Sequence, residues 1–264
     1  MRTGRLLLVG ASLAAAAAAC ALLAAGPPFT WLALLVAVAY LAFLVAGVMH
    51  PRLALFAPVL CRGSDRRPAL ALTFDDGPHP IATRKVLAVL ANAQARATFF
   101  VLGAKAERSP EVLCEIAAAG HEIGIHGETH DRWLALSHPD AMVASLERAI
   151  AAVERATGVR PRLWRPPIGH VSPRTAVAAR RLGLALVGWS VRSRDGRAAT
   201  TAEQAARRVL AGLRPGAIIL MHDAAEHDDR EPVAPAALPR ILDETRRRGL
   251  ACVTVSELGA GGRP

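Results

Sequence analysis

Residues 69–80 read Ala-Leu-Ala-Leu-Thr-Phe-Asp-Asp-Gly-Pro-His-Pro, and this stretch decides the fold. Its first six residues are apolar apart from one threonine, and two carboxylates and a Gly-Pro pair follow directly. A short apolar run bounded by turn-forming residues is typical of a buried strand in a parallel sheet. Asp75 and Asp76 therefore stand at the carboxyl end of a predicted strand, which is where α/β proteins bind their ligands.

Similar apolar runs recur after residue 80, and amphipathic, Ala-rich segments separate them. The predicted strands are residues 69–74, 97–102, 121–126, 162–165, 184–191, 217–221 and 251–255. The predicted helices are residues 80–93, 109–119, 138–156, 173–182, 202–213 and 235–248. Prolines lie near helix starts and glycines follow helices or precede strands, as expected at helix boundaries. Strands that alternate with helices predict an α/β fold of about seven parallel strands, closed as a barrel or open.

Ionisable side chains follow five of the predicted strands. They are Asp75 and Asp76, His126, Arg165, Asp195, and His222 and Asp223. Because the carboxyl ends of parallel strands meet at one edge of a sheet, we expect these side chains to share one rim.

His126 and His130 are four residues apart, so both imidazoles can converge on one ion, and neutral imidazole is a good zinc ligand. Alone, this spacing is weak evidence, and an Asp-Asp-Gly-Pro sequence alone favours a turn. Together they predict a metal site of two histidines and one aspartate, with the other aspartate facing the substrate as a base. Such a ligand set leaves coordination positions open for water and substrate, which is typical of catalytic sites.

The segment 68–258 resembles the polysaccharide deacetylases, the NodB-homology domain of carbohydrate esterase family four, through four motifs in that family's order. The motifs are residues 73–78 (Thr-Phe-Asp-Asp-Gly-Pro), 126–130 (His-Gly-Glu-Thr-His), 165–169 (Arg-Pro-Pro-Ile-Gly) and 220–222 (Leu-Met-His). The resemblance implies a distorted (β/α) barrel that hydrolyses acyl groups, chiefly N-acetyl groups, on sugars. It also implies a divalent metal cofactor, in the first place zinc, with cobalt or nickel as alternatives.

Carried over residue by residue, the resemblance makes Asp76, His126 and His130 the metal ligands. It makes Asp75 the catalytic base and Arg165 the residue that positions this base.

The resemblance also assigns the general acid to His222, with Asp195 beside it, and oxyanion binding to the backbone N–H of Ile168. Two positions depart from the family. An Asp-Trp pair is common where this chain has Asp195 and Gly196, so one apolar wall of the acetyl pocket is missing or replaced. An aromatic residue is common where Ile168 stands, but that position contributes only backbone chemistry.

We therefore expect a hydrolase of carbon–nitrogen bonds other than peptide bonds, which deacetylates an N-acylated amino sugar in a glycan. Metal-activated water attacks the amide, Asp75 takes its proton and His222 protonates the departing amine. One alternative is a deacetylase or deformylase of a lipid-linked sugar at the cytoplasmic face of a membrane. A second is a non-catalytic barrel that only binds glycan, which the presence of base, ligands and acid disfavours.

The N-terminal region has no charged residue between Leu6 and Met49, and a Pro-Pro pair divides it into two apolar runs. Each run, residues 6–26 and 31–49, has about the length of a bilayer-spanning helix. We predict that they form a transmembrane hairpin. A cleaved signal peptide is the alternative for the first run, because arginines precede it and small residues end it.

Arginines flank this hairpin at both ends and are absent from its turn. They are Arg2 and Arg5 before it, and Arg52, Arg62, Arg66 and Arg67 after it. The positive-inside rule places both ends, and the domain that follows, in the cytoplasm. The chain is thus predicted to comprise a membrane segment, residues 1–60, and a catalytic domain, residues 61–264, at an inner membrane whose bilayer is a partner.

The charge balance is basic, with 32 Lys and Arg against 22 Asp and Glu in 264 residues, a formal net charge of +10. Such a balance suits an anionic partner, for example a phospholipid surface or an acidic glycan. Nucleic acid is not expected as a partner, because no zinc-finger or RNP-type motif occurs and aromatic residues are only 4%.

Overall fold

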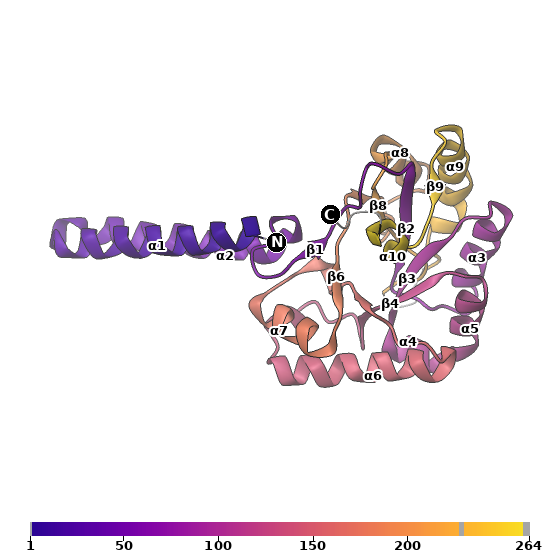
Figure 1. Cartoon of the computed structure of the whole chain (residues 1–264), viewed down its shortest axis with the longest axis horizontal. Helices are drawn as coiled ribbons and strands as arrows, with labels where there is room; N and C mark the ends of the chain where they lie inside the picture. Colours follow the sequence, from indigo (N-terminus) through magenta and orange to yellow (C-terminus); the bar gives the residue numbers. More distant parts are fainter. Residues whose placement is uncertain (1, 227–229, 261–264) are drawn as a thin grey trace.

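The computed structural model describes residues 2–226 and 230–260, in which a rod of two helices projects from an α/β part (Figure 1). The rod consists of α1 (Arg2–Ala24) and α2 (Thr30–Met49), joined through the short helix η1 (Pro27–Phe29). The predicted catalytic domain, residues 61–264, includes residues 227–229 and 261–264, which lie outside the described part of the chain.

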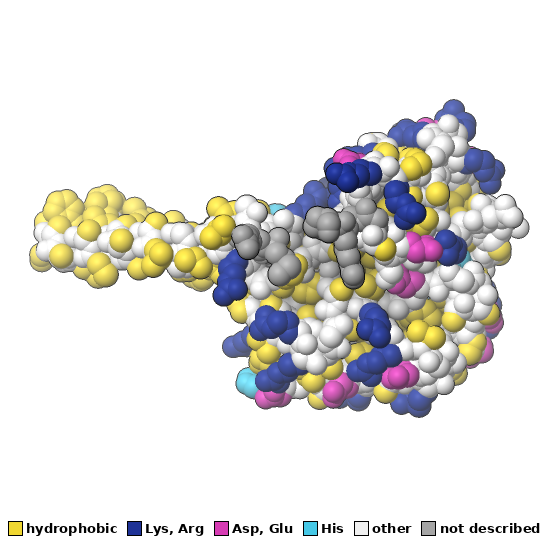
Figure 2. Space-filling view, viewed as in Figure 1, with side chains coloured by type: hydrophobic (Ala, Val, Ile, Leu, Met, Phe, Trp, Pro, Cys, Tyr) yellow, Lys and Arg dark blue, Asp and Glu magenta, His cyan; other side chains and the backbone are white. Residues whose placement is uncertain are grey.

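Both helices of the rod are long and apolar enough to cross a membrane. The two spans are Thr3–Ala24, with a hydropathy of 2.4, and Pro27–Met49, with 2.7. In the space-filling view, apolar side chains cover the rod, and Lys and Arg side chains begin where it meets the α/β part (Figure 2). The hydroxyls of Ser12 and Tyr40 form a hydrogen bond of 2.6 Å between the helices. The two predicted apolar helices are therefore present and pack against each other.

The α/β part is built on one parallel sheet, and the strand order within the described residues is β1-β6-β5-β4-β3-β2-β8-β7, with β9 beside β2. The strands are β1 (Val59–Leu60), β2 (Ala69–Asp75), β3 (Ala97–Leu102), β4 (Glu122–Gly127), β5 (Leu163–Trp164), β6 (Ala185–Val187), β7 (Val191–Arg192), β8 (Ile218–His222) and β9 (Ala251–Cys252). The predicted α/β class with a parallel sheet is confirmed.

The prediction of a single strand over residues 184–191 is wrong. This segment forms β6, which pairs with β5 and β1 at one end of the sheet, and β7, which pairs with β8 at the other end. The Gly188 N–H donates to the Leu60 carbonyl and the Ser190 N–H donates to the Ile218 carbonyl. Three residues thus connect the two ends of the sheet, which curls into a half-barrel.

Most of the helices surround the sheet on its outer side, whereas the last helix, α10, packs Val255 and Leu258 against side chains inside the curled sheet (Figure 1). The helices are α3 (Ala82–Asn92), α4 (Gly103–Arg108), α5 (Pro110–Ala118), α6 (Pro139–Thr157), α7 (Pro173–Leu182), α8 (Ala202–Gly212), α9 (Ala234–Arg247) and α10 (Val255–Ala260), with short 3-10 turns η2 (Pro51–Leu53), η3 (Leu134–Leu136) and η4 (Pro167–Gly169). The sequence predicted all of these α-helices except the six-residue helices α4 and α10. Capping boxes at Ser172 and Thr201 fix the starts of α7 and α8.

The core lies between the sheet and these helices. Every residue of β2 is buried, and so is every residue of β3. Helices cover one face of these strands, and α10 with the opposite strands of the curled sheet covers the other. Phe74 of β2 and Phe99 of β3 stack with their ring centroids 5.1 Å apart. The rigid strand β2 therefore holds the backbone of Asp75 in a fixed position at its carboxyl end.

Candidate active site

One pocket of about 150 Å³ lies at the carboxyl ends of the strands. Six of the eight predicted site residues line it: Asp75, Asp76, His126, His130, Ile168 and His222. The other two, Arg165 and Asp195, lie directly behind it, in contact with Asp75 and His222 respectively. The structure therefore brings together all eight residues that the sequence singled out.

Asp76, His126 and His130 form a divalent-metal site at one side of the pocket. Asp76 Oδ1 lies 3.5 Å from His126 Nε2 and 3.7 Å from His130 Nε2, and the three ligand atoms lie within 4.8 Å of one another. Asp76 Oδ1 is buried and has no hydrogen-bond partner among residues 2–226 and 230–260. A buried carboxylate oxygen without a partner is costly, and a cation held by these three groups would satisfy it.

The His126 ring is oriented as a metal ligand by its second nitrogen. Nδ1 lies 2.8 Å from the backbone carbonyl of Arg165, which only accepts hydrogen bonds, so Nδ1 carries the proton and Nε2 faces Asp76. Burial lowers the pKa of His126, and the nearby charges of Asp75 and Asp76 offset only part of that shift. The imidazole is therefore held neutral, which is the ligand form.

His130 has a carboxylate behind it that sequence reasoning missed. Its Nδ1 lies 3.1 Å from Glu226 Oε1, which is within ion-pair distance. Arg132 Nη2 donates to the other oxygen of Glu226 at 2.6 Å. Glu226 comes from the loop after β8, and no motif in the sequence marks it.

Asp75 is held by a buried arginine. Arg165 Nη1 donates to Asp75 Oδ1 at 2.7 Å and to Thr73 Oγ1 at 2.8 Å, while Nη2 donates to the Gly188 carbonyl at 2.9 Å. The guanidinium also lies 4.2 Å from the Phe100 ring centroid. Burial lowers the pKa of Arg165, but the charge of Asp75 opposes this shift and the guanidinium stays charged. One carboxylate oxygen of Asp75 is thereby fixed, and this contact sets how the carboxylate faces the pocket.

His222 pairs with Asp195 across strands β8 and β7. His222 Nδ1 lies 2.7 Å from Asp195 Oδ1, and the His222 backbone N–H donates to Asp195 Oδ2 at 2.8 Å. The Ser193 hydroxyl donates to the same carboxylate. Burial alone would lower the pKa of His222, but the charge and hydrogen bond of Asp195, helped by Asp76 and Asp75, raise it to about 9. The ring therefore carries its proton at neutral pH.

The backbone is strained at the rim of the pocket. Ile168 lies in η4 with φ 53°, a left-handed conformation that is rare for a β-branched residue. Asp76 and Arg194, which also line the pocket, have φ values of 73° and 62°. Such strain persists where surrounding structure enforces it and is concentrated at functional sites. The conformation at Ile168 is compatible with a backbone N–H aimed at a ligand.

Asp223 supports the turn that carries the aspartates. Its Oδ2 accepts a hydrogen bond of 2.5 Å from Thr83 Oγ1, and a Cβ at Gly77 would lie 2.2 Å from that oxygen. Only glycine fits at position 77 without displacing the carboxyl group. Burial raises the pKa of Asp223 to about 7.

Trp189 is a pocket residue that sequence reasoning missed. Its indole packs on Gly169, where a Cβ would lie 2.4 Å from the ring. Trp189 gives the pocket an apolar wall, whereas Gly196 provides none, and a Cβ at that position would lie 3.0 Å from the His222 ring. One signal in the sequence could have indicated it: a tryptophan two residues after the end of β6, in a chain with only four tryptophans.

Comparisons with known proteins agree with this geometry. A family model described as "Polysaccharide deacetylase" matches residues 62–187. The chain is 36% identical to a chitooligosaccharide deacetylase of Sinorhizobium fredii over 71% of this chain and 90% of that protein.

Two solved structures are also similar. One is the Bc1960 peptidoglycan N-acetylglucosamine deacetylase, with a TM-score of 0.70 and 29% identity over 76% of this chain and 92% of that one. The other is a family 4 acetyl xylan esterase from Clostridium thermocellum, solved with a cobalt ion, with a TM-score of 0.65 and 33% identity over 72% of this chain and 89% of that one.

Proposed function

The chain belongs to the polysaccharide deacetylase family, and from that premise we propose that it hydrolyses the N-acetyl amide of N-acetylglucosamine units. It is a carbohydrate N-deacetylase, a hydrolase of carbon–nitrogen bonds outside peptides. The observation that carries the proposal is one pocket with a metal triad, the carboxylate of Asp75 and the protonated ring of His222. N-Acetylglucosamine is the acetylated sugar named or implied by the relatives that act on chitooligosaccharides and peptidoglycan.

Asp76, His126 and His130 would hold the metal, which we propose to be zinc because one carboxylate and two imidazoles suit it. A bound divalent ion supplies Lewis-acid chemistry, polarising the amide carbonyl and making water more acidic. The cobalt ion of the acetyl xylan esterase supports a divalent ion of this size as an alternative.

Asp75 acts as the base. Its Oδ1 is occupied by Arg165, so the carboxylate presents its remaining oxygen to the pocket and takes a proton from the attacking water. Arg165 is a positioning residue, because it is fully buried and acts through Asp75.

Ile168 acts on the negative charge that forms on the carbonyl oxygen, and His222 acts on the departing amine. The Ile168 N–H donates to the oxyanion of the tetrahedral intermediate. His222, kept protonated by Asp195, gives its proton to the departing amine. The water oxygen bonds to the carbonyl carbon, the carbon–nitrogen bond breaks, and the products are acetate and the free amino sugar.

Acetate release by the purified full-length protein tests the proposal. Protein stripped by a chelator should release no acetate from chitooligosaccharides, and zinc or cobalt should restore release with about one ion bound per chain. A protein that binds chitooligosaccharides but releases no acetate with any divalent metal would instead be a non-catalytic glycan-binding barrel.

We also propose that residues 1–60 anchor the catalytic domain, residues 61–264, to the inner membrane as a two-helix hairpin, and that the half-barrel is the family's distorted (β/α) barrel. The arginines at both ends of the hairpin support a cytoplasmic catalytic domain. Reporter fusions after Arg67 should then behave as cytoplasmic, and the mature protein should retain its first helix. A mature N-terminus near Gly26 would contradict the hairpin and this orientation.

A further inference from the structure

A groove of about 590 Å³ lies where the helical rod meets the sheet. It is lined by Ala46, Met49, His50, Pro51, Arg52, Leu53, Trp189 and Arg192. Apart from Trp189, its apolar side chains belong to the end of α2 and to η2, and Met49 and Leu53 are 52% and 44% exposed. Apolar surface of this kind, next to a predicted membrane span, suits a hydrocarbon chain.

The groove has a fixed position relative to the catalytic pocket. The Val171 N–H donates to the Val48 carbonyl at 3.0 Å, which joins the segment after η4 to the end of α2. Arg52 Nη2 donates to the Ser190 carbonyl at 2.7 Å, which joins η2 to the segment between β6 and β7. If α2 spans the membrane, these contacts hold the groove at the membrane surface and the rim of the sheet beside it.

The groove and the catalytic pocket share two side chains. Trp189 and Arg192 line both, with the Arg192 guanidinium 5.6 Å from the Trp189 ring centroid. A molecule that lies in the groove therefore passes directly over this pair to reach the metal site.

Arginine side chains gather in the catalytic pocket next to this shared pair. Arg192, Arg194 and Arg197 line the catalytic pocket, and none has a carboxylate within ion-pair distance among residues 2–226 and 230–260. Burial and the charges of Arg197 and Arg194 lower the pKa of Arg192, and the charges of Asp195 and Asp75 offset only part of this shift. An anion bound here would relieve this repulsion, and guanidinium groups bind phosphate oxygens in a bidentate manner.

Resting on the proposed deacetylation, we propose that the substrate is a lipid-linked amino sugar, an N-acetylated sugar joined through phosphate to a membrane lipid. Its hydrocarbon chain lies against the end of α2 and in the groove, its phosphate binds Arg192 and Arg194, and its acetamido group reaches the metal site. A neutral oligosaccharide would use neither the groove nor the arginines. A soluble sugar phosphate would use the arginines but leave Met49 and Leu53 without a partner.

Three substrates separate these contributions in the metal-loaded, full-length protein in lipid nanodiscs. They are N-acetylglucosamine on polyprenyl diphosphate, N-acetylglucosamine 1-phosphate, and a neutral chitooligosaccharide. We expect kcat/KM for acetate release to be highest for the lipid-linked sugar, and each contribution, lipid and phosphate, to be worth roughly tenfold or more.

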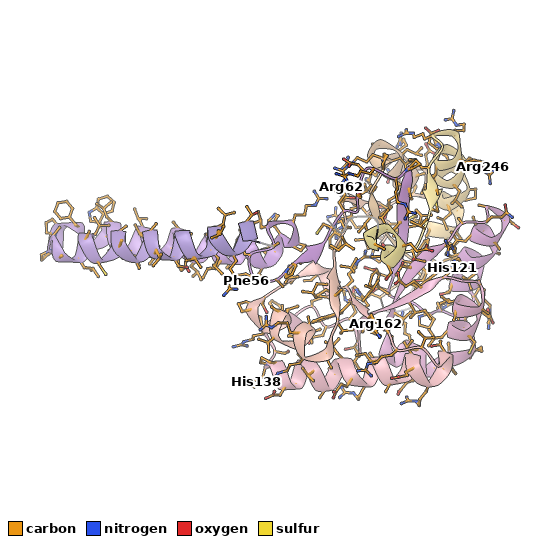
Figure 3. All side chains as sticks on the ribbon, viewed as in Figure 1. Phe56, Arg62, His121, His138, Arg162 and Arg246 are labelled. Atoms are coloured by element: carbon orange, nitrogen blue, oxygen red, sulfur yellow. The ribbon has the colours of Figure 1, made fainter. Side chains whose placement is uncertain are left out.

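Two variants locate the contributions, and a third serves as control. Arg192→Gln should lower kcat/KM for both phosphate-bearing substrates relative to the chitooligosaccharide, by roughly tenfold. Leu53→Asp should lower kcat/KM for the lipid-linked sugar relative to the soluble sugar phosphate. Arg246→Gln removes an exposed arginine of α9, remote from the rod (Figure 3), and should leave all three values as in the unmodified protein.

Each remaining outcome is decisive. Equal kcat/KM for the lipid-linked sugar and the soluble sugar phosphate overturns the role of the groove. A chitooligosaccharide that is hydrolysed as well as both overturns the whole inference while leaving the proposed deacetylation intact. No acetate from any of the three substrates contradicts the proposed deacetylation itself.

Discussion

Two of the histidines that line the pocket are in opposite states, His126 at the metal side and His222 at the acid side. His126 Nδ1 faces a backbone carbonyl, and burial lowers its pKa. His222 Nδ1 faces the carboxylate of Asp195, which outweighs burial and raises the pKa to about 9. The group behind the ring therefore decides whether a histidine is a neutral ligand or a charged acid.

The two sides also differ in how they are assembled. The metal side combines two histidines that are four positions apart, His126 and His130, with Asp76 from the end of β2. The acid side joins residues 27 positions apart, Asp195 and His222, across the β7–β8 pair. Substitutions can test whether the two sides are as separate in function as they are in structure.

The largest effect is expected at the metal side. His126→Ala should lose the metal and reduce turnover to background, because it removes a ligand whose neutral state is built into the fold. Asp75→Asn should retain the metal and still lose roughly 10²–10⁴-fold in turnover, the usual contribution of a general base. Metal content by elemental analysis and acetate release check both. Near-normal turnover of Asp75→Asn would refute its role as base.

His222→Ala should leave metal content unchanged and reduce turnover by roughly 10²–10⁴-fold, because the amine then departs without a proton donor. The same two measurements apply. Loss of metal from this variant would show that the two sides of the pocket are not separate.

Asp195→Asn should move the basic limb of the kcat/KM profile, expected near pH 9, to lower pH, because it removes the charge that raises the His222 pKa. The same substitution should also reduce the loss of folding stability at high pH. A raised pKa in the folded state contributes stability that is complete below about pH 6.5 and is lost as pH rises through about 9. Urea unfolding from pH 6 to 10 should therefore show less loss of stability in the variant. An unmoved basic limb would make Asp195 purely structural.

The smallest effect is expected for Ser193→Ala, which removes one hydrogen bond to Asp195. The pKa of Asp195 should rise slightly, its support of His222 should weaken, and the basic limb should move by less than the shift in Asp195→Asn. Ser190→Ala is the matched control, because Ser190 lies in the same segment as Ser193. Its hydroxyl donates to the Ile218 carbonyl and does not contact Asp195. Equal shifts in the two serine variants would remove Ser193 from the acid side.

The strand pattern and the site residues could be predicted because each motif directly follows an apolar run, at the end of a strand. The split of residues 184–191 could not, because the run stays apolar through Gly188 while its backbone partners change from β1 to β8. Helix α4 was missed because six residues are too few for an amphipathic pattern, and a buried lysine, Lys105, lies within it.

Trp189, Glu226 and the pocket arginines Arg192, Arg194 and Arg197 could not be predicted as site residues for a different reason. Their positions depend on how loops after the strands fold over the pocket, and local sequence does not encode that. Ile168 shows the opposite case: the motif marked the residue, and its left-handed backbone came only from the structure.

The central position of β2 sets the order in which the molecule can be assembled. Thr73 of β2 donates its hydroxyl to Ile219 of β8, 146 residues later in the chain. At 5–20 residues per second of synthesis, the nascent strand waits roughly 7–30 s for that neighbour. During this time one edge of a largely apolar strand is unpaired, which invites aggregation. Long-range pairing of this kind also slows folding, so the metal ligand Asp76 reaches its final geometry only when most of the chain has been made.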